Sequence, residues 1–258
     1  MRTVAGVFAH PDDETLLAGG TLAKYAAEGA RVLVVTCTSG EAGDTADPSV
    51  TCVGEARREE LRRACDVLGV ARVELLGFRD SGLPASAAPG TLAGASVREV
   101  ADRVALILRE ERPQVVITHD ERGGYGHADH VRASAAALSA AASVGVPKLY
   151  HSVIPRSAVA AFHAALERAG LRAKWAAPSG ADVDLELGVD ESAVTTRVDV
   201  RAQIPVKRRA LAEHRTQMKD HILLRAPEDA IRALWGEERY TLIGARPERT
   251  EVDLFEGL

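Results

Sequence analysis

The residue types that bind metal ions and transfer protons are concentrated in the segment His10-Pro11-Asp12-Asp13-Glu14. A catalytic zinc ion takes three protein ligands and keeps one position for water. His10 and Asp13, three residues apart on a turn stiffened by Pro11, could supply two of these ligands. One carboxylate would then remain to act as a base. The alternative interpretation is a helix start whose carboxylates complement the helix dipole.

A second group of such residues lies in Gly124-Tyr125-Gly126-His127-Ala128-Asp129-His130. Two histidines with Asp129 between them could give a third metal ligand and a carboxylate that orients an imidazole. The residues alone do not choose between His127 and His130 as the ligand. A solvated helix start with incidental histidines is the alternative interpretation.

Both segments follow short apolar runs that we predict to be β-strands. The expected strands cover residues 3–9, 31–36, 73–76 and 114–118, with helices over 16–28, 55–68 and 96–111. This alternation predicts an α/β fold with a doubly wound, mostly parallel, Rossmann-like sheet covered on both faces. Such sheets bind ligands at their carboxyl edge, where both segments and the loops 38–54 and 80–94 would emerge.

The last third of the sequence is less regular. We expect helices over 153–170 and 204–217, short strands over 184–189 and 194–200, and a late strand over 240–243. Residues 1–152 are therefore interpreted as the α/β catalytic core. Residues 153–258 are interpreted as an irregular C-terminal α+β cap that completes the same domain.

The overall composition of the chain limits the partners and the cellular location that can be expected for it. The formal charge is −5, from 32 basic and 37 acidic side chains, which argues against a nucleic-acid partner. No apolar run reaches the roughly 18 residues of a membrane span, and no signal peptide is evident. The three cysteines, Cys37, Cys52 and Cys65, are typical of reduced thiols, so we expect a cytoplasmic protein.

The motifs together resemble those of the PIG-L/LmbE-like family of zinc-dependent de-N-acetylases. The family includes the N-acetylglucosaminyl-phosphatidylinositol deacetylase and the deacetylases and amidase of mycothiol and bacillithiol metabolism. The resemblance covers residues 3–135 well and is weaker afterwards. It rests on AHPDDE (9–14), TSGEAG (38–43), RDSG (79–82), GHADH (126–130) and, late in the chain, AEHRTQ (212–217).

The resemblance also implies roles for individual residues. His10, Asp13 and His130 would bind one Zn²⁺, although another divalent ion such as Fe²⁺ would suit the same ligands. Asp12 would be the general base. The remaining implied catalytic residues are His127, which would stabilise the transition state or protonate the leaving amine, Asp129, which would orient His127, and Tyr125, which would polarise the amide oxygen.

Three further residues match positions that hold sugar hydroxyls in the family: Arg57, Asp80 and, more weakly, Glu41. Arg58 could exchange roles with Arg57. His214 and Gln217 share one face of a late helix, where they could either pack in the core or line the site.

The expected reaction is removal of an N-acetyl group from an N-acetylglucosamine-type conjugate, with this small amino-sugar molecule as the partner. A mycothiol S-conjugate-type amidase is the closest alternative, because the sequence does not show how much room the acyl side has. An antibiotic-tailoring deacetylase would share the same motifs. A nucleotide-binding protein without hydrolytic activity would need a GxGxxG turn after the first strand, where this chain has HPDDE. The sequence is compatible with a homo-oligomer and does not predict the oligomeric state.

Overall fold

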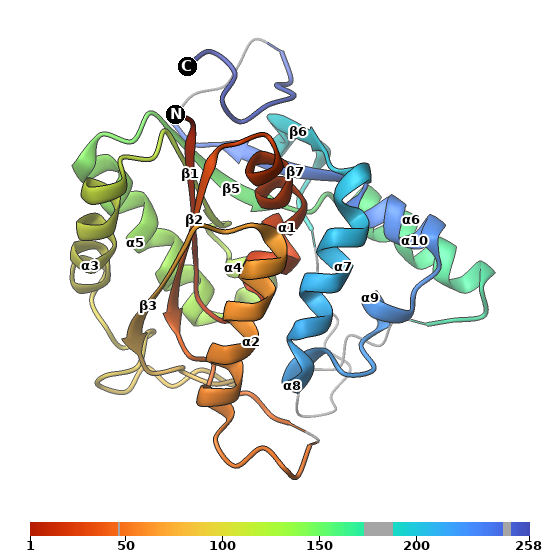
Figure 1. Cartoon of the computed structure of the whole chain (residues 1–258), viewed down its shortest axis with the longest axis horizontal. Helices are drawn as coiled ribbons and strands as arrows, with labels where there is room; N and C mark the ends of the chain where they lie inside the picture. The colour runs from red at the N-terminus through yellow and green to blue at the C-terminus, as the bar shows by residue number, and fades with distance from the viewer. Residues whose placement is uncertain (46, 173–187, 245–248) are drawn as a thin grey trace.

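A computed structural model describes residues 1–45, 47–172, 188–244 and 249–258 of the chain. These residues form a seven-stranded sheet in the order β3-β2-β1-β4-β5-β7-β6 (Figure 1). The first five strands are parallel, whereas β7 runs antiparallel to both β5 and β6. The strands are β1 (Thr3–Phe8), β2 (Arg31–Thr38), β3 (Arg72–Phe78), β4 (Val115–His119), β5 (Lys148–Val153), β6 (Thr196–Asp199) and β7 (Glu237–Leu242).

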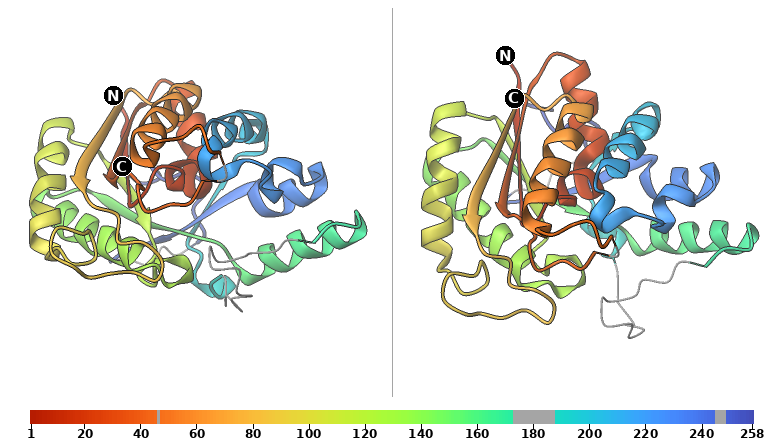
Figure 2. Two further views of the ribbon diagram at one scale, coloured as in Figure 1. Left: turned by 90° about the horizontal axis from the view of Figure 1, so that it is seen from below. Right: turned by 60° about the horizontal axis from the view of Figure 1, so that its bottom comes forward.

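Helices cover both faces of this sheet, as Figures 1 and 2 show. Alternate residues of the central strands, such as Ala5 and Val7, pack against α3 (Val97–Glu111) and α5 (Ala128–Val144). The other residues of the same strands, such as Val4 and Phe8, pack against α1 (Asp13–Ala27) and α2 (Val53–Leu68). This confirms the predicted fold class, a doubly wound and mostly parallel α/β sheet.

Local sequence explains where the helices next to the site begin and end. Ser96 caps α3 by accepting a hydrogen bond from the Glu99 N–H, the first half of a capping box. Gly69 and Gly145 end α2 and α5 in the left-handed conformation that glycine adopts without steric cost. The alanines of α5 allow it to pack closely on β4 and α3.

The last third of the chain extends the sheet and adds a helical layer beyond β5. This layer has its own apolar cluster, which includes Phe162, Leu211 and Trp235. Its helices are α6 (Arg156–Arg168), α7 (Ile204–Glu213), α8 (Arg215–Met218), α9 (Ile222–Arg225) and α10 (Glu228–Trp235). Two single 3₁₀ turns, η1 (Glu191–Ala193) and η2 (Arg201–Gln203), flank β6.

Several expectations for the second half of the chain need correction. The strand β5 was not predicted, because its mixed sequence KLYHSV lacks a clear apolar run. The helix expected over 204–217 is broken at His214 into α7 and α8. Of the strand expected over 184–189, residues 184–187 lie outside the described residues.

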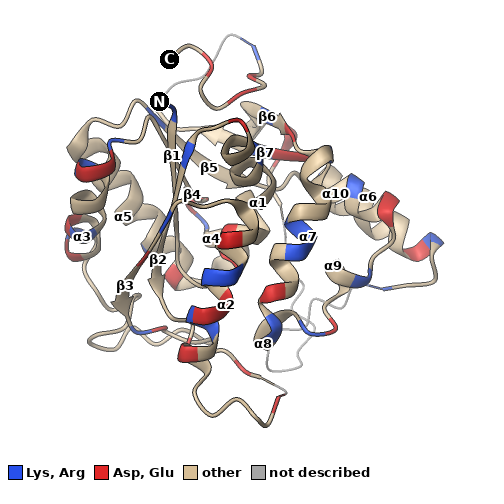
Figure 3. Cartoon of the chain, viewed as in Figure 1, with Lys and Arg blue, Asp and Glu red and all other residues tan. Residues whose placement is uncertain are grey.

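Basic and acidic residues both occur along α2 and α7, where Figure 3 colours them blue and red. All three cysteines are free thiols, with Cys37 in the core beneath the sheet edge that carries the site. Among the helices that the structure describes, none combines the length and apolar character that a membrane crossing requires.

Candidate metal centre and active site

The residues singled out by type and spacing gather at the carboxyl edge of the sheet, between β1 and β4. At this position the strand order reverses, because β2 and β3 lie to one side of β1 and β4 and β5 to the other. Open α/β sheets bind their ligands at such a switch point. His10 comes from the turn between β1 and α1, Asp13 is the first residue of α1, and His130 comes from the first turn of α5.

Three side chains in this crevice converge on one point. His10 Nδ1 lies 3.2 Å from His130 Nε2 and 3.5 Å from Asp13 Oδ2, and His130 Nε2 lies 3.5 Å from Asp13 Oδ1. All three residues are buried. Tetrahedral ligands at zinc-like bond lengths of about 2.0–2.2 Å would be roughly 3.3–3.6 Å apart. The spacing of the three side chains therefore fits one divalent ion.

Hydrogen bonds on the outer ring nitrogens fix which inner nitrogens can bind a cation. His10 Nε2 donates to Asp129 Oδ2 at 3.2 Å, and His130 Nδ1 donates to the Gly123 carbonyl at 3.2 Å. In neutral rings these bonds leave lone pairs on His10 Nδ1 and His130 Nε2. Burial lowers the pKa of His130 well below its ordinary value, which favours the neutral form. Two lone pairs and a carboxylate facing one another are stabilised by a cation.

A further imidazole beside this group, that of His119, was missed by the sequence analysis. It ends β4, stacks on His130 with ring centroids 4.1 Å apart, and lies 3.4 Å from Asp13 through Nε2. The same Nε2 accepts a hydrogen bond from the Ala9 N–H, so this ring also ties β4 to β1. Its position at the end of a predicted strand was the only signal that could have identified it.

His10 belongs to a second group of candidate ligands on its other side. His10, Asp80 and His127 are also buried and close enough to hold an ion. His10 Nε2 lies 3.6 Å from Asp80 Oδ1, whereas its Nδ1 faces Asp13 and His130. The imidazole of His10 thus lies between two groups of candidate ligands. Its Nε2, on the side of Asp80, is already occupied by the hydrogen bond to Asp129.

Asp12 adjoins the three converging side chains in a strained conformation. Its φ of 106° is in the left-handed region, which a non-glycine residue adopts only when its surroundings hold it there. The Asp12 N–H donates to Glu14 Oε2 at 2.9 Å, and its carboxylate accepts from Arg57 at 3.1 Å. Burial raises the pKa of Asp12 to about 6, against the opposing effect of Arg57. A base with such a pKa is suited to reaction near neutral pH.

Arg57, rather than Arg58, points into the site. Its guanidinium donates to the carbonyls of Pro11 at 2.5 Å and Gly40 at 2.8 Å as well as to Asp12. Gly40 has φ +65°, and a Cβ at this position would lie 2.2 Å from the guanidinium, so the packing requires glycine there. Arg58 is exposed and donates to Ser39.

Asp80 and Glu41 are brought together from separate edge loops. Glu41 accepts from the Asp80 N–H at 3.0 Å, and Asp80 accepts from the Ala42 N–H at 3.3 Å. Burial opposes ionisation, but the His10 imidazole and the Gly82 N–H lower the pKa of Asp80. This pair of loops borders the side of His10 that faces Asp80.

The predicted catalytic residues Tyr125, His127 and Asp129 also lie close together at the start of α5. One contact differs from the expectation that Asp129 orients His127. Tyr125 is partly exposed and lies edge-on to His127 and His130. The carboxylate of Asp129 accepts from His10 and Ser81, not from His127. His127 Nδ1 instead accepts the Asp129 backbone N–H and caps α5. Asp129 therefore orients His10 directly.

The match to known proteins covers the segments that form this site. The PIG-L family model, described as GlcNAc-PI de-N-acetylase, matches residues 6–141. The chain belongs to the PIG-L family. Membership of this family, together with curated relatives named as deacetylases, makes it a hydrolytic N-deacetylase.

Two curated relatives of this PIG-L protein are named 1D-myo-inositol 2-acetamido-2-deoxy-alpha-D-glucopyranoside deacetylase. The relative from Thermobispora bispora is 38% identical and aligns over 95% of this chain and 89% of its own length. The relative from Thermomonospora curvata is 39% identical and aligns over 100% of this chain and 97% of its own length.

Solved structures share the fold of this PIG-L protein. N,N'-diacetylchitobiose deacetylase from Pyrococcus horikoshii matches with a TM-score of 0.60 and 23% identity over 94% of this chain and 84% of its own. GalB, a 4-carboxy-2-hydroxymuconate hydratase from Pseudomonas putida, matches with a TM-score of 0.65 and 20% identity over 96% and 99% of the two chains. Because a hydratase shares it, the fold alone does not determine the reaction.

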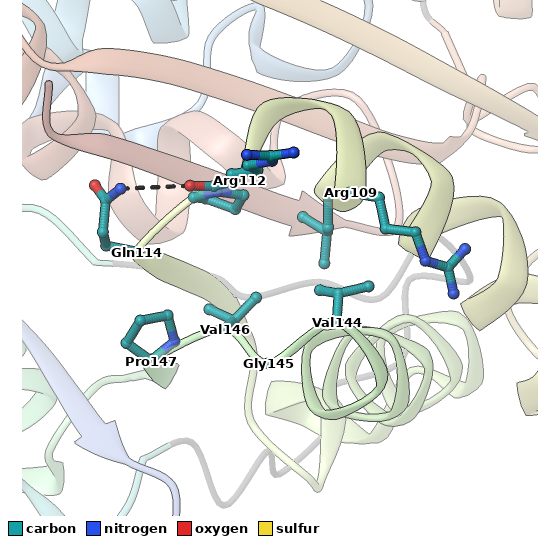
Figure 4. A pocket seen from close by; sticks show the side chains of 9 residues that line it. Arg109, Arg112, Gln114, Val144, Gly145, Val146 and Pro147 are labelled. Carbon is teal, nitrogen blue, oxygen red and sulfur yellow. Dashed lines mark hydrogen bonds between the residues drawn. The ribbon is translucent and has the colours of Figure 1, made fainter.

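Two cavities of this PIG-L protein differ in their relation to the site. The larger, about 620 Å³, lies between the C-terminal ends of α3 and α5, next to the start of β4, and is drawn in Figure 4. It is therefore at the amino edge of the sheet, opposite the candidate metal centre. The smaller, about 200 Å³, is lined by Asp13, His119, Tyr125 and His130 and adjoins the metal centre.

Proposed function

We propose that this PIG-L protein is a zinc-dependent hydrolase that removes the N-acetyl group from an N-acetylglucosamine unit of a small conjugate. The observation that carries the proposal is the convergence of His10, Asp13 and His130 beside Asp12 at the switch point of the sheet. These three side chains would hold the ion. When bound, a zinc ion would lower the pKa of a water molecule to about 7 and polarise the amide carbonyl.

The side chains around the ion would then move the protons. The Asp12 carboxylate, held by Arg57 and by its own strained backbone, takes a proton from the attacking water. The water oxygen adds to the amide carbon, and the Tyr125 hydroxyl, with His127, stabilises the negative oxygen that forms. The C–N bond then breaks to give acetate and a free amine, which takes its proton from His127 or Asp12.

Recognition of the sugar is assigned to the polar side of the site. Arg57, Asp80 and Glu41 lie on the loops that border Asp12 and the outer side of His10. Guanidinium and carboxylate groups suit the vicinal hydroxyls of a sugar. The relatives' name supports a substrate in which inositol carries the acetylated glucosamine.

Amine release tests this proposal. Metal-free protein, and protein reconstituted with one equivalent of Zn²⁺, would be incubated with N-acetylglucosaminyl-inositol, N-acetylglucosamine and diacetylchitobiose, and free amine would be measured. We expect the inositol conjugate to be hydrolysed fastest, and only by the metal-loaded protein. Equal activity without metal would contradict metal dependence, and no amine from any conjugate would contradict the proposed substrate class.

A further inference from the structure

The smaller cavity has a polar end at the candidate metal centre and an apolar far end. At the near end lie Asp13, His119, Tyr125 and His130. The far end belongs to the helical layer formed by the last third of the chain, which lies on the side of the sheet that carries β7 and β6 in Figure 1. Its main apolar residues are Ile154, Val159, Phe162, Leu223, Leu234 and Trp235.

The apolar wall is part of a packed cluster, not a loose surface. Phe162, Leu223 and Trp235 are buried in the apolar cluster that joins α6, α9 and α10. A wall formed in this way is largely pre-organised, as is usual for sites that bind small molecules.

The polar side chains assigned to the sugar do not line this cavity. Asp12, Arg57 and Asp80 are all absent from its walls. The His10 ring accounts for this separation, since its Nδ1 faces Asp13 and its Nε2 faces Asp129 and Asp80. An amide bound at the metal centre would thus have a polar region on one side and an apolar region on the other.

We propose that this cavity binds the acyl chain of the substrate and accepts chains several carbons longer than acetyl. The inference rests on the proposed deacetylase function. Four further lining residues are polar: Asp120, Arg122, Ser152 and His221. A sugar or inositol ring placed against the remaining, apolar walls would lose hydrogen bonds to water without replacement, which is costly. An acyl chain loses none. The cavity measures about 200 Å³, whereas a cavity that holds one water molecule needs only about 10–15 Å³ by a comparable measure.

A series of acyl chains on one sugar tests the inference. N-acetyl, N-butyryl, N-hexanoyl and N-octanoyl derivatives of glucosaminyl-inositol would be compared by kcat/KM on the Zn²⁺-loaded protein. Each methylene that enters an apolar site contributes up to about fourfold. We expect kcat/KM to rise from acetyl to hexanoyl. A steady fall from acetyl onwards, with acetyl still hydrolysed, would overturn the inference and leave the deacetylase proposal intact.

Two substitutions at neighbouring positions of α6 test whether the preference for longer acyl chains depends on the cavity. Val159 is half-buried and lines the cavity, whereas Ala160 is exposed and does not. Val159→Phe should lower kcat/KM for the hexanoyl substrate by at least about tenfold and change the acetyl substrate by less than about threefold. Ala160→Phe should change neither. Equal losses for both substrates in Val159→Phe would contradict an acyl site.

A second series separates the acyl chain from an apolar group on the other side of the amide. Methyl, butyl and octyl glycosides of N-acetylglucosamine would be compared for the same variants. If Val159→Phe discriminates among the glycosides and not among the acyl chains, the cavity binds the aglycone and the inference is wrong.

Binding without turnover provides an independent measurement. By calorimetry on the Zn²⁺-loaded protein, octanoate should bind at least about tenfold more tightly than acetate. Val159→Phe should remove this difference, and Ala160→Phe should keep it. If no amide is hydrolysed, the deacetylase proposal fails and this measurement alone decides the acyl cavity. Equal affinities for octanoate and acetate would refute it.

Discussion

His214 and Glu14 form a buried hydrogen bond of 2.8 Å between Nε2 and Oε1, although they are 200 residues apart in the sequence. His214 stands at the break between α7 and α8, and Glu14 lies in the first turn of α1. Glu14 also accepts from the Asp12 N–H and from the Thr15 hydroxyl. The strained turn that carries Asp12 is therefore held from the last third of the chain. Of the two interpretations of His214, packing beneath the site is the one that its contacts support.

The first prediction concerns the stability that this contact provides. His214→Ala leaves the Glu14 carboxylate buried without its imidazole partner, so the free energy of unfolding should fall by about 3–5 kcal/mol. Urea unfolding measures this change. Arg62→Ala, which removes exposed ion pairs to Glu59 and Asp66, should cost less than about 1 kcal/mol. Similar losses in the two variants would contradict the structural role of His214.

Asp12 and Asp13 should respond differently to the same substitution. Asp13→Asn removes a charged ligand from the three converging side chains, so bound zinc should be lost on dialysis. Asp12→Asn keeps the shape and removes the base, so zinc should stay while the single-turnover rate falls on the order of 10²–10⁴-fold. Metal analysis and rapid-quench rates on both variants give the comparison. Full activity in Asp12→Asn with zinc still bound would exclude Asp12 as the base.

The two candidate groups around His10 can be distinguished at His127 and His130. If the ion is held by His10, Asp13 and His130, then His130→Ala should lower zinc affinity by at least about tenfold. His127→Ala should retain zinc and lose rate. Competition with a fluorescent zinc chelator measures the affinity without any assay of activity. The opposite pattern, with loss of zinc only in His127→Ala, would move the ion to the side of Asp80.

Arg57 should affect turnover as well as substrate binding. Arg57→Ala leaves Asp12 without its cation and two buried carbonyls without a donor, so kcat should fall by about tenfold or more while KM also rises. Arg58→Ala is the matched control, since Arg58 is exposed and its guanidinium donates to the Ser39 hydroxyl. If Arg57→Ala raises KM alone, Arg57 contacts substrate without supporting the base.

A pH-dependent contribution to stability is expected at Glu111. Hydrogen bonds from Arg31, and then Arg72, lower the pKa of Glu111 to about 2 although burial opposes them. A carboxylate with a depressed pKa stabilises the fold above its ordinary pKa, and this contribution is lost as the pH falls from about 4.5 towards 2. Urea unfolding at pH 7 and pH 3 should therefore show a larger difference for the native chain than for Glu111→Gln.

The control for this prediction is the adjacent carboxylate. Glu110 contacts Arg72 at 2.9 Å, but its side chain is 65% exposed. Glu110→Gln should leave the difference between pH 7 and pH 3 nearly unchanged, because an exposed ion pair contributes little. An equal effect of the two substitutions would show that the loss of one negative charge, not the part-buried contact of Glu111 with Arg31 and Arg72, sets the pH dependence.

The sequence predicted the parts of the fold and site that depend on local pattern. Val-rich runs such as residues 31–36 predicted central strands, because both faces of a parallel sheet are buried. The proximity of His10 and Asp13 could also be predicted, since both lie in one short segment. Contacts that depend on side-chain orientation could not be predicted. The partner of the Asp129 carboxylate is His10, and no spacing rule distinguishes it from His127.

Long-range pairing accounts for the other differences. His119 enters the site only because β4 pairs with β1, which places the end of one strand beside the end of the other. No glycine or proline marks the break of the helix at His214. The partner of His214 is Glu14, which lies near the other end of the chain. Such contacts follow from tertiary structure rather than from local propensity.

Most of the apolar wall of the smaller cavity is built by residues 154–235, with Leu16 and Leu17 of α1 completing it, whereas the candidate metal ligands and base lie within residues 10–130. Evolution could therefore alter the accepted acyl group through substitutions in one part of the chain while the chemistry of the other is retained. Exchanging the segment from β5 to α10 between relatives would be a direct way to transfer acyl preference, provided that the residue at position 214 remains a histidine to meet Glu14.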